Sequence, residues 1–97
     1  MDSTVRNWLR NESVARLTGI ELYLFGSVRT SKNPNDVDLL IVYDPSHIDI
    51  DIAISTRWSL QRKIHEITGA PADIVLLSTR EVEQTKFLNR IDAERLN

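Results

Sequence analysis

Two short groups of residues in the first half of the chain have the types and spacing that chemistry on phosphates requires. Asp36 and Asp38 are separated by one residue. On a strand their side chains would point to the same face, with Cα atoms about 6.5 Å apart. Two carboxylates that close repel each other, and a hard divalent cation removes the repulsion. The pair therefore predicts a metal site, and the plainer alternative is two solvated turn residues.

The second group, Gly26 and Ser27, ends the apolar run that precedes this pair. Glycine lets a backbone approach a phosphate closely, and the Ser27 hydroxyl and amide can donate hydrogen bonds to it. Arg29 and Lys32 are the cations of the loop that follows, and we expect them to contact a triphosphate. A phosphate-holding turn beside a metal-holding pair is the minimum for nucleoside triphosphate chemistry.

A third carboxylate, Asp73, begins a later strand-like run. If that strand lies beside the strand of Asp38, Asp73 faces the same metals. In a two-metal displacement one metal activates the incoming oxygen and the other steadies the leaving pyrophosphate. We therefore expect Asp36 and Asp38 to bridge the metals, and Asp73 to hold the nucleophile-side metal and accept a proton. The alternative for Asp73 is an exposed strand start.

The scaffold that these residues need is predicted by the hydrophobic pattern. Strands are expected over 20–25, 37–43 and 73–77, and the second, nearly all apolar, is expected at the centre of the sheet. The first two should be antiparallel, and the last two, joined through a helix, should be parallel. This is an α/β (α+β) fold: a small mixed β-sheet of about three to four strands flanked by helices.

Three helices are expected around this sheet. The first covers 2–17, with a break near 11–13, and the last covers about 79–93 behind a capping box at Ser78–Glu81. The middle helix, over about 51–68, ends at Gly69. Its predicted inward stripe contains five apolar residues: Ile50, Ile54, Leu60, Ile64 and Ile67.

Length and composition limit the function classes. The 97 residues predict one domain over 1–97, and 41% apolar with 27% charged residues is ordinary for a globular chain. The net charge of −2 is not that of a general polyanion binder, so strong nucleic-acid binding by this chain alone is not expected. The chain has no cysteine and no apolar run long enough for a membrane span, so we expect a cytoplasmic protein.

Taken together, the motifs carry a resemblance to a known family. Leu-Phe-Gly-Ser at 24–27 and Asn-Asp-Val-Asp-Leu-Leu-Ile-Val at 35–42 resemble the signature of the DNA polymerase beta-type nucleotidyltransferase superfamily. They resemble more closely the minimal nucleotidyltransferases, or MNT proteins, that partner HEPN proteins. The resemblance implies that Gly26, Ser27, Asp36 and Asp38 bind nucleotide phosphates and two Mg²⁺ ions. It implies by position that Asp73 completes the triad.

The reaction implied by this resemblance is transfer of AMP from ATP, or of another nucleotide, to an acceptor hydroxyl with release of pyrophosphate. Only 24 residues follow Asp73, so we expect the acceptor to bring its own recognition surface, as a protein does. The leading hypothesis is a protein adenylyltransferase that performs AMPylation as the antitoxin of a HEPN-type toxin, in a toxin–antitoxin system.

Two alternatives remain open. The first is a binding module that neutralises its partner by forming a complex; in its favour, Val28–Ser31 lacks the glycine that relatives commonly carry after the Gly-Ser pair. The second is a catalytic subunit that modifies RNA ends together with a separate chain. The sequence has no stripe of basic residues, which argues against RNA binding by this chain alone.

Overall fold

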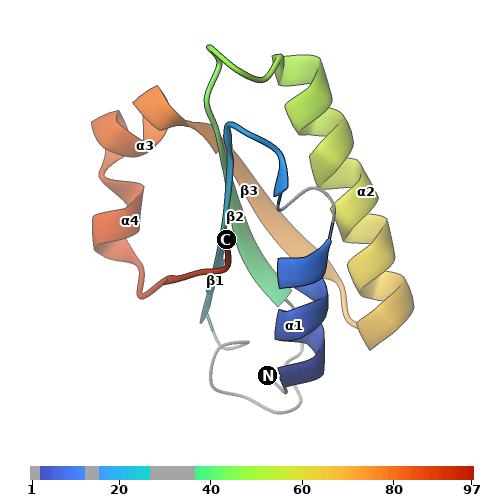
Figure 1. The fold of residues 1–97 in the computed structure, drawn as a ribbon. Helices are drawn as coiled ribbons and strands as arrows, with labels where there is room; N and C mark the ends of the chain where they lie inside the picture. Colours follow the sequence, from blue (N-terminus) through green and yellow to red (C-terminus); the bar gives the residue numbers. More distant parts are fainter. Residues whose placement is uncertain (1–2, 13–15, 27–36) are drawn as a thin grey trace.

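The computed structural model describes residues 3–12, 16–26 and 37–97, with side chains from residue 6 onward. Figure 1 shows a sheet with α1 and α2 on one side and α3 and α4 on the other. The elements follow in the order α1 (Ser3–Asn11), β1 (Ile20–Phe25), β2 (Val37–Tyr43), α2 (Ile50–Thr68), β3 (Ala72–Ser78), α3 (Thr79–Thr85), α4 (Phe87–Arg90) and β4 (Glu94–Arg95).

The four strands lie in the order β3-β2-β1-β4. β1 pairs antiparallel with β2, and β2 pairs parallel with β3, as the connections predicted. β2 is central and buried at six of its seven positions, because its apolar run is covered on both faces. The predicted bounds of β1 and β2 are confirmed, and β3 begins one residue earlier and ends one residue later than expected.

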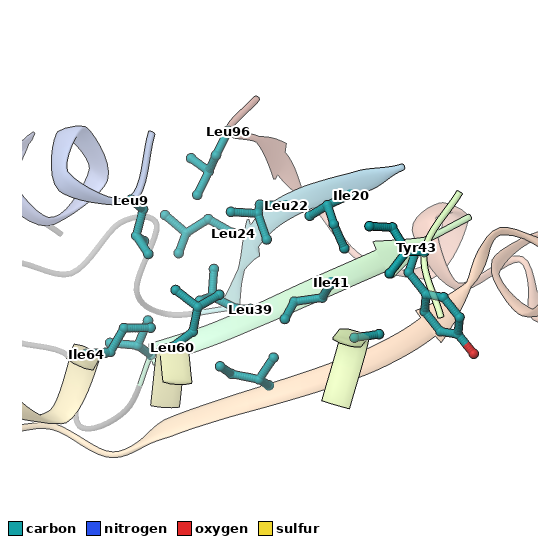
Figure 2. Close-up of a cluster of buried hydrophobic side chains, with 14 residues drawn as sticks. Leu9, Ile20, Leu22, Leu24, Leu39, Ile41, Tyr43, Leu60, Ile64 and Leu96 are labelled. Atoms are coloured by element: carbon teal, nitrogen blue, oxygen red, sulfur yellow. The ribbon is translucent and has the colours of Figure 1, made fainter. Parts of the chain in front are cut away.

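The main core lies between the sheet and the pair α1 and α2 (Figure 2). β2 contributes Leu39 and Ile41, which are fully buried, and α2 contributes Leu60 and Ile64. Leu9 of α1 belongs to the same core and lies beside Leu24 of β1 in Figure 2. Alternation along β2 then directs Asp38, Leu40 and Val42 to the opposite face, under α3 and α4.

The end of the chain differs from the single helix expected over 79–93. The capping box is present: Ser78 Oγ accepts from the Glu81 amide at 3.1 Å, and Glu81 Oε1 accepts from the Ser78 amide at 3.0 Å. The helix then breaks at Lys86, whose φ of 53° is left-handed, so α3 and α4 are two short helices. The chain finally returns to pair with β1, where Leu96 donates its amide to Leu22 O at 2.8 Å.

The other two helices also correct the predictions in part. α1 ends at Asn11, near the expected break, and residues 17–19 are not helical. Residues 2 and 13–15 lie outside the described ones. In α2 the predicted inward stripe is wrong for Ile50 and Ile67, which are 55% and 47% exposed. Ala53 and Thr56 face the sheet instead, together with Leu60 and Ile64.

α2 ends as predicted at Gly69, which has a left-handed φ of 71° and donates its amide to His65 O at 2.9 Å. None of the helices in the described part of the chain has the length and apolar character required to cross a membrane.

Candidate active site

The sheet register brings two predicted acids side by side. Asp38 is the second residue of β2 and Asp73 the second residue of β3, and the parallel pairing makes them direct neighbours. Neighbouring strands lie about 4.8 Å apart, and residues in register point to the same face. Asp38 is half-buried and Asp73 exposed, so the two carboxylates form an accessible acidic pair on the α3 side of the sheet.

The turn before β3 fixes this register. Pro71 cannot continue α2, and its carbonyl accepts a hydrogen bond from the Val37 amide at 2.9 Å. The side chain of Gln61 in α2 donates to Ala72 O at 3.4 Å. The first bond joins the starts of β2 and β3, and the second holds the start of β3 against α2. Asp38 and Asp73, each one residue further along its strand, therefore lie side by side.

Gly26 makes room for one of the two carboxylates. It follows β1 directly and has a left-handed φ of 76°, which side-chain-bearing residues rarely adopt. A Cβ placed there would overlap Asp38 Oδ2 and would lie 3.1 Å from Asp38 Cγ. Glycine was expected here for its approach to a phosphate; the structure adds that any larger residue would displace the Asp38 carboxylate.

An aromatic pair borders the site and was not found by the sequence reasoning. Phe25 is the register neighbour of Asp38 on β1, and its ring meets Phe87 edge to face, with centroids 6.0 Å apart and planes at 84°. Phe87 reaches this position because the chain turns at Lys86. The contact joins residues 62 positions apart, and no local pattern in the sequence signals it.

The remaining predicted site residues, Ser27, Arg29, Lys32 and Asp36, lie outside the described residues. Among the residues that are described, no group of three or more His, Cys, Asp or Glu side chains is suited to a metal. Asp38 and Asp73 supply two adjacent carboxylates, the hard oxygen ligands that Mg²⁺ prefers. Because Gly26 has no Cβ, the Asp38 carboxylate has room at its present position. The oxygen donors of Asp38 and Asp73 therefore fit a divalent cation.

Two surface hollows in the described part of the chain lie away from these acids. One, of about 450 Å³, is bordered by α2, Glu12 and Leu17, and the Glu12–Lys63 ion pair of 2.7 Å spans it. A second, of about 430 Å³, lies beside Trp58 on α2. Both are on the helix that covers the face opposite Asp38 and Asp73, so neither is the acidic site.

Comparison with known proteins identifies a family. A family model described as "Polymerase beta, Nucleotidyltransferase" matches residues 12–94, which include Gly26, Asp38 and Asp73. Searches of curated proteins and of solved structures give no significant match. Members of this family generally use a nucleoside triphosphate and a divalent metal. Because the match covers most of the chain and the four-stranded mixed sheet with flanking helices is consistent with that fold, the chain belongs to the polymerase beta-type nucleotidyltransferase family.

Proposed function

We propose that this chain is a Mg²⁺-dependent adenylyltransferase that transfers AMP from ATP to a hydroxyl of a partner protein. The observation that carries the proposal is the register of Asp38 with Asp73 on one accessible face, with Gly26 packed against Asp38. That arrangement supplies carboxylate oxygens for metal-bound triphosphate at the edge of a rigid sheet. Asp36, Ser27, Arg29 and Lys32 complete the proposed site, through metal and phosphate contacts.

The proposed reaction forms one bond and breaks one. The acceptor hydroxyl oxygen attacks the α-phosphorus of ATP, and the bond from that phosphorus to the bridging oxygen of pyrophosphate breaks. The hydroxyl proton goes to a carboxylate, for which Asp73 is the candidate because it is exposed. Bound Mg²⁺ would supply charge stabilisation for the leaving pyrophosphate. Products are the AMP ester of the acceptor and pyrophosphate.

We propose a protein as the acceptor, specifically a HEPN-type toxin that this chain neutralises as its antitoxin. The motif resemblance to MNT proteins supports that role. The described elements after β3 are α3, α4 and the two-residue β4. These elements cover the sheet through Phe87 and pair with β1, so they serve the fold itself.

The test is an intact-mass measurement. The chain is incubated with ATP, Mg²⁺ and the product of the adjacent gene, which we expect to be a helical HEPN protein. The partner should gain the mass of one AMP group, and Asp38→Ala and Asp73→Ala should each abolish the gain. Asp49→Ala is the matched control, since Asp49 is an exposed acid at the start of α2 and should leave the gain intact. No gain with the wild-type chain, or a gain that survives Asp38→Ala, would contradict the proposal.

A second candidate is a neutralising module without transfer activity, for which the sequence of the loop after Gly26 is the specific observation. Val28–Ser31 has no glycine for a close phosphate approach. This candidate predicts that Asp38→Ala still neutralises the partner and that the wild-type chain binds no Mg²⁺–ATP. Calorimetry with Mg²⁺–ATP distinguishes the two candidate functions. If the wild-type chain binds Mg²⁺–ATP and Asp38→Ala does not, the result supports the transferase.

A further inference from the structure

The two edges of the sheet differ in a way that the nucleotide site does not explain. The strand at one edge, β4, is two residues long, whereas β3 at the other edge spans Ala72–Ser78. β3 has one charged side chain, Asp73, and neither proline nor lysine. Edge strands present unpaired N–H and C=O groups, and proteins usually protect them by shortness, charge or proline. In the part of the chain that is described, no strand pairs with the outer edge of β3.

An apolar stripe of α2 lies on the same side. Ile50, Ile54 and Trp58 recur every four residues, and Trp58 is 66% exposed. Gln61 identifies the side, because its amide reaches Ala72 O of β3. Ile54 precedes Gln61 by seven residues, about two helical turns, so both point the same way. We call Ile50, Ile54 and Trp58 the α2 stripe; it flanks the open edge of β3.

We propose that the open edge of β3 and the α2 stripe form the interface between two copies of this chain, related by a twofold axis at Val75. Antiparallel pairing of β3 with its copy would satisfy the free backbone groups of both strands. This register places Ile74 opposite Leu76 and Asp73 opposite Leu77. The two Asp73 carboxylates therefore stay about four residues apart along the joint sheet, and no like charges face each other.

The position of α2 allows this pairing. Gln61 reaches sideways to Ala72, so α2 lies inward of β3, towards the boundary with β2. Leu76, on the helix side of β3, is accordingly only half-buried. With strands about 4.8 Å apart, α2 and its copy would have axes about 10 Å apart. Helices pack at about 8–10 Å, so the two helices would meet when the strands pair.

The same geometry sets which residues of α2 meet. Ala72 is level with Gln61, and Val75 is about 10 Å further along β3. α2 runs antiparallel to β3 and rises about 1.5 Å per residue, so about 10 Å corresponds to about seven residues. Counting back seven residues from Gln61 gives Ile54, which is therefore level with Val75. The axis at Val75 then passes beside Ile54 and places Ile50 of one copy opposite Trp58 of the other. The 430 Å³ hollow beside Trp58 provides room for that contact.

Charge favours a second copy as the occupant of this surface. α2 carries Asp51 in its first turn and Arg57 and Arg62 in its middle. The antiparallel arrangement sets Asp51 of one helix opposite Arg57 of the other, with Arg62 about one turn further along. The same arrangement makes the dipoles of the two helices antiparallel, which is electrostatically favourable. The surface is thus complementary to itself in backbone hydrogen bonding and in charge.

Sedimentation equilibrium over a range of concentrations tests the proposal. The wild-type chain should approach twice the 11.1 kDa of a single copy. Ile54→Lys puts two like charges at the axis and should weaken self-association at least about tenfold. Ile52→Lys is the matched control: Ile52 is 48% exposed on the same helix but is two residues from Ile54, so it points to nearly the opposite side of α2 and should not change the mass. Circular dichroism verifies that both variants fold.

Disulfide trapping tests the register independently. The chain has no cysteine, so Val75→Cys introduces a single thiol at the axis. Oxidation should yield a covalent dimer, and Ile52→Cys should yield none. A mass of 11.1 kDa at every concentration would overturn the proposal, as would association lost in Ile52→Lys but kept in Ile54→Lys. A persisting dimer in which Val75→Cys does not cross-link would overturn the proposed register.

Discussion

The two faces of the sheet use the same strands for different purposes. On the face under α1 and α2, β2 presents Val37, Leu39 and Ile41, all buried in the main core. On the opposite face β2 begins with Asp38, beside Asp73, and only then continues with apolar residues. Adjacent carboxylates repel each other and add nothing to a hydrophobic core. The comparison teaches that β2 is buried along both faces, and that only the start of its α3 face, at Asp38, positions charge.

The largest effect on stability should come from the core face. Leu39→Ala removes a fully buried side chain from the centre of the sheet and should lower the free energy of unfolding by about 2–5 kcal/mol. Its neighbour on the site face gives the contrast: Asp38→Asn keeps the size of the side chain and leaves no cavity, so it should lower that free energy clearly less than Leu39→Ala does. Urea denaturation without Mg²⁺ measures both, and equal losses would contradict the division between faces.

The next effect concerns the contact between Gly26 and Asp38. Gly26→Ala should destabilise the fold by about 1–3 kcal/mol, through its positive φ and the overlap with the carboxylate. Gly69→Ala is the matched control, since Gly69 also has a positive φ but its added Cβ would meet nothing within 4 Å. Only Gly26→Ala should weaken Mg²⁺–ATP binding in calorimetry. If the two variants bind alike, the carboxylate does not depend on the space at Gly26.

A smaller effect should come from the connection between β3 and α3. Ser78→Ala removes the hydroxyl that accepts from the Glu81 amide and should lower the free energy of unfolding by about 1 kcal/mol. Thr79→Ala, one residue later on the exposed side, should cost clearly less. Thermal or urea unfolding measures both, and equal costs would show that the capping box does not stabilise α3.

The smallest effect should appear in the turn after β2 and depend on pH. Hydrogen bonds from the Ser46 hydroxyl, at 2.7 Å, and the Ser46 amide, at 2.9 Å, lower the pKa of Asp44 from its usual value of 3.8. A lowered pKa in the folded state stabilises the protein above the unfolded value, and this gain is lost as the pH falls through the folded value. Asp44→Asn should therefore be less stable than wild type near pH 7, and the difference should shrink below about pH 4. A difference that does not change with pH would contradict this account.

The sheet was largely predictable from the sequence because its signals are local. β1 and β2 are mainly apolar runs that end at Gly26 and before Asp44-Pro45, and these stops set their bounds. The parallel direction of β2 and β3 follows from the crossover rule, whereas the register that sets Asp38 beside Asp73 depends on the bond from the Val37 amide to Pro71 O. The capping box at Ser78 and the stop at Gly69 are likewise local.

The features that could not be predicted depend on tertiary contacts. The break at Lys86 accompanies the packing of Phe87 on Phe25, and β4 exists only because the end of the chain pairs with β1. In α2, Ile50 matches the helical period, yet Ala53 and Thr56 face the sheet because the helix rotates to fit β2 and β3. The exposed Ile50 that results belongs to the proposed dimer surface.

The most direct test of the central claim is a double-mutant cycle on Mg²⁺–ATP binding, measured by calorimetry. If Asp38 and Asp73 hold one metal–nucleotide complex, each of Asp38→Asn and Asp73→Asn should remove most of the binding free energy. The double variant should then lose little more than either single variant. Binding unchanged in either single variant, or losses that add fully in the double variant, would contradict a shared site on this face of the sheet.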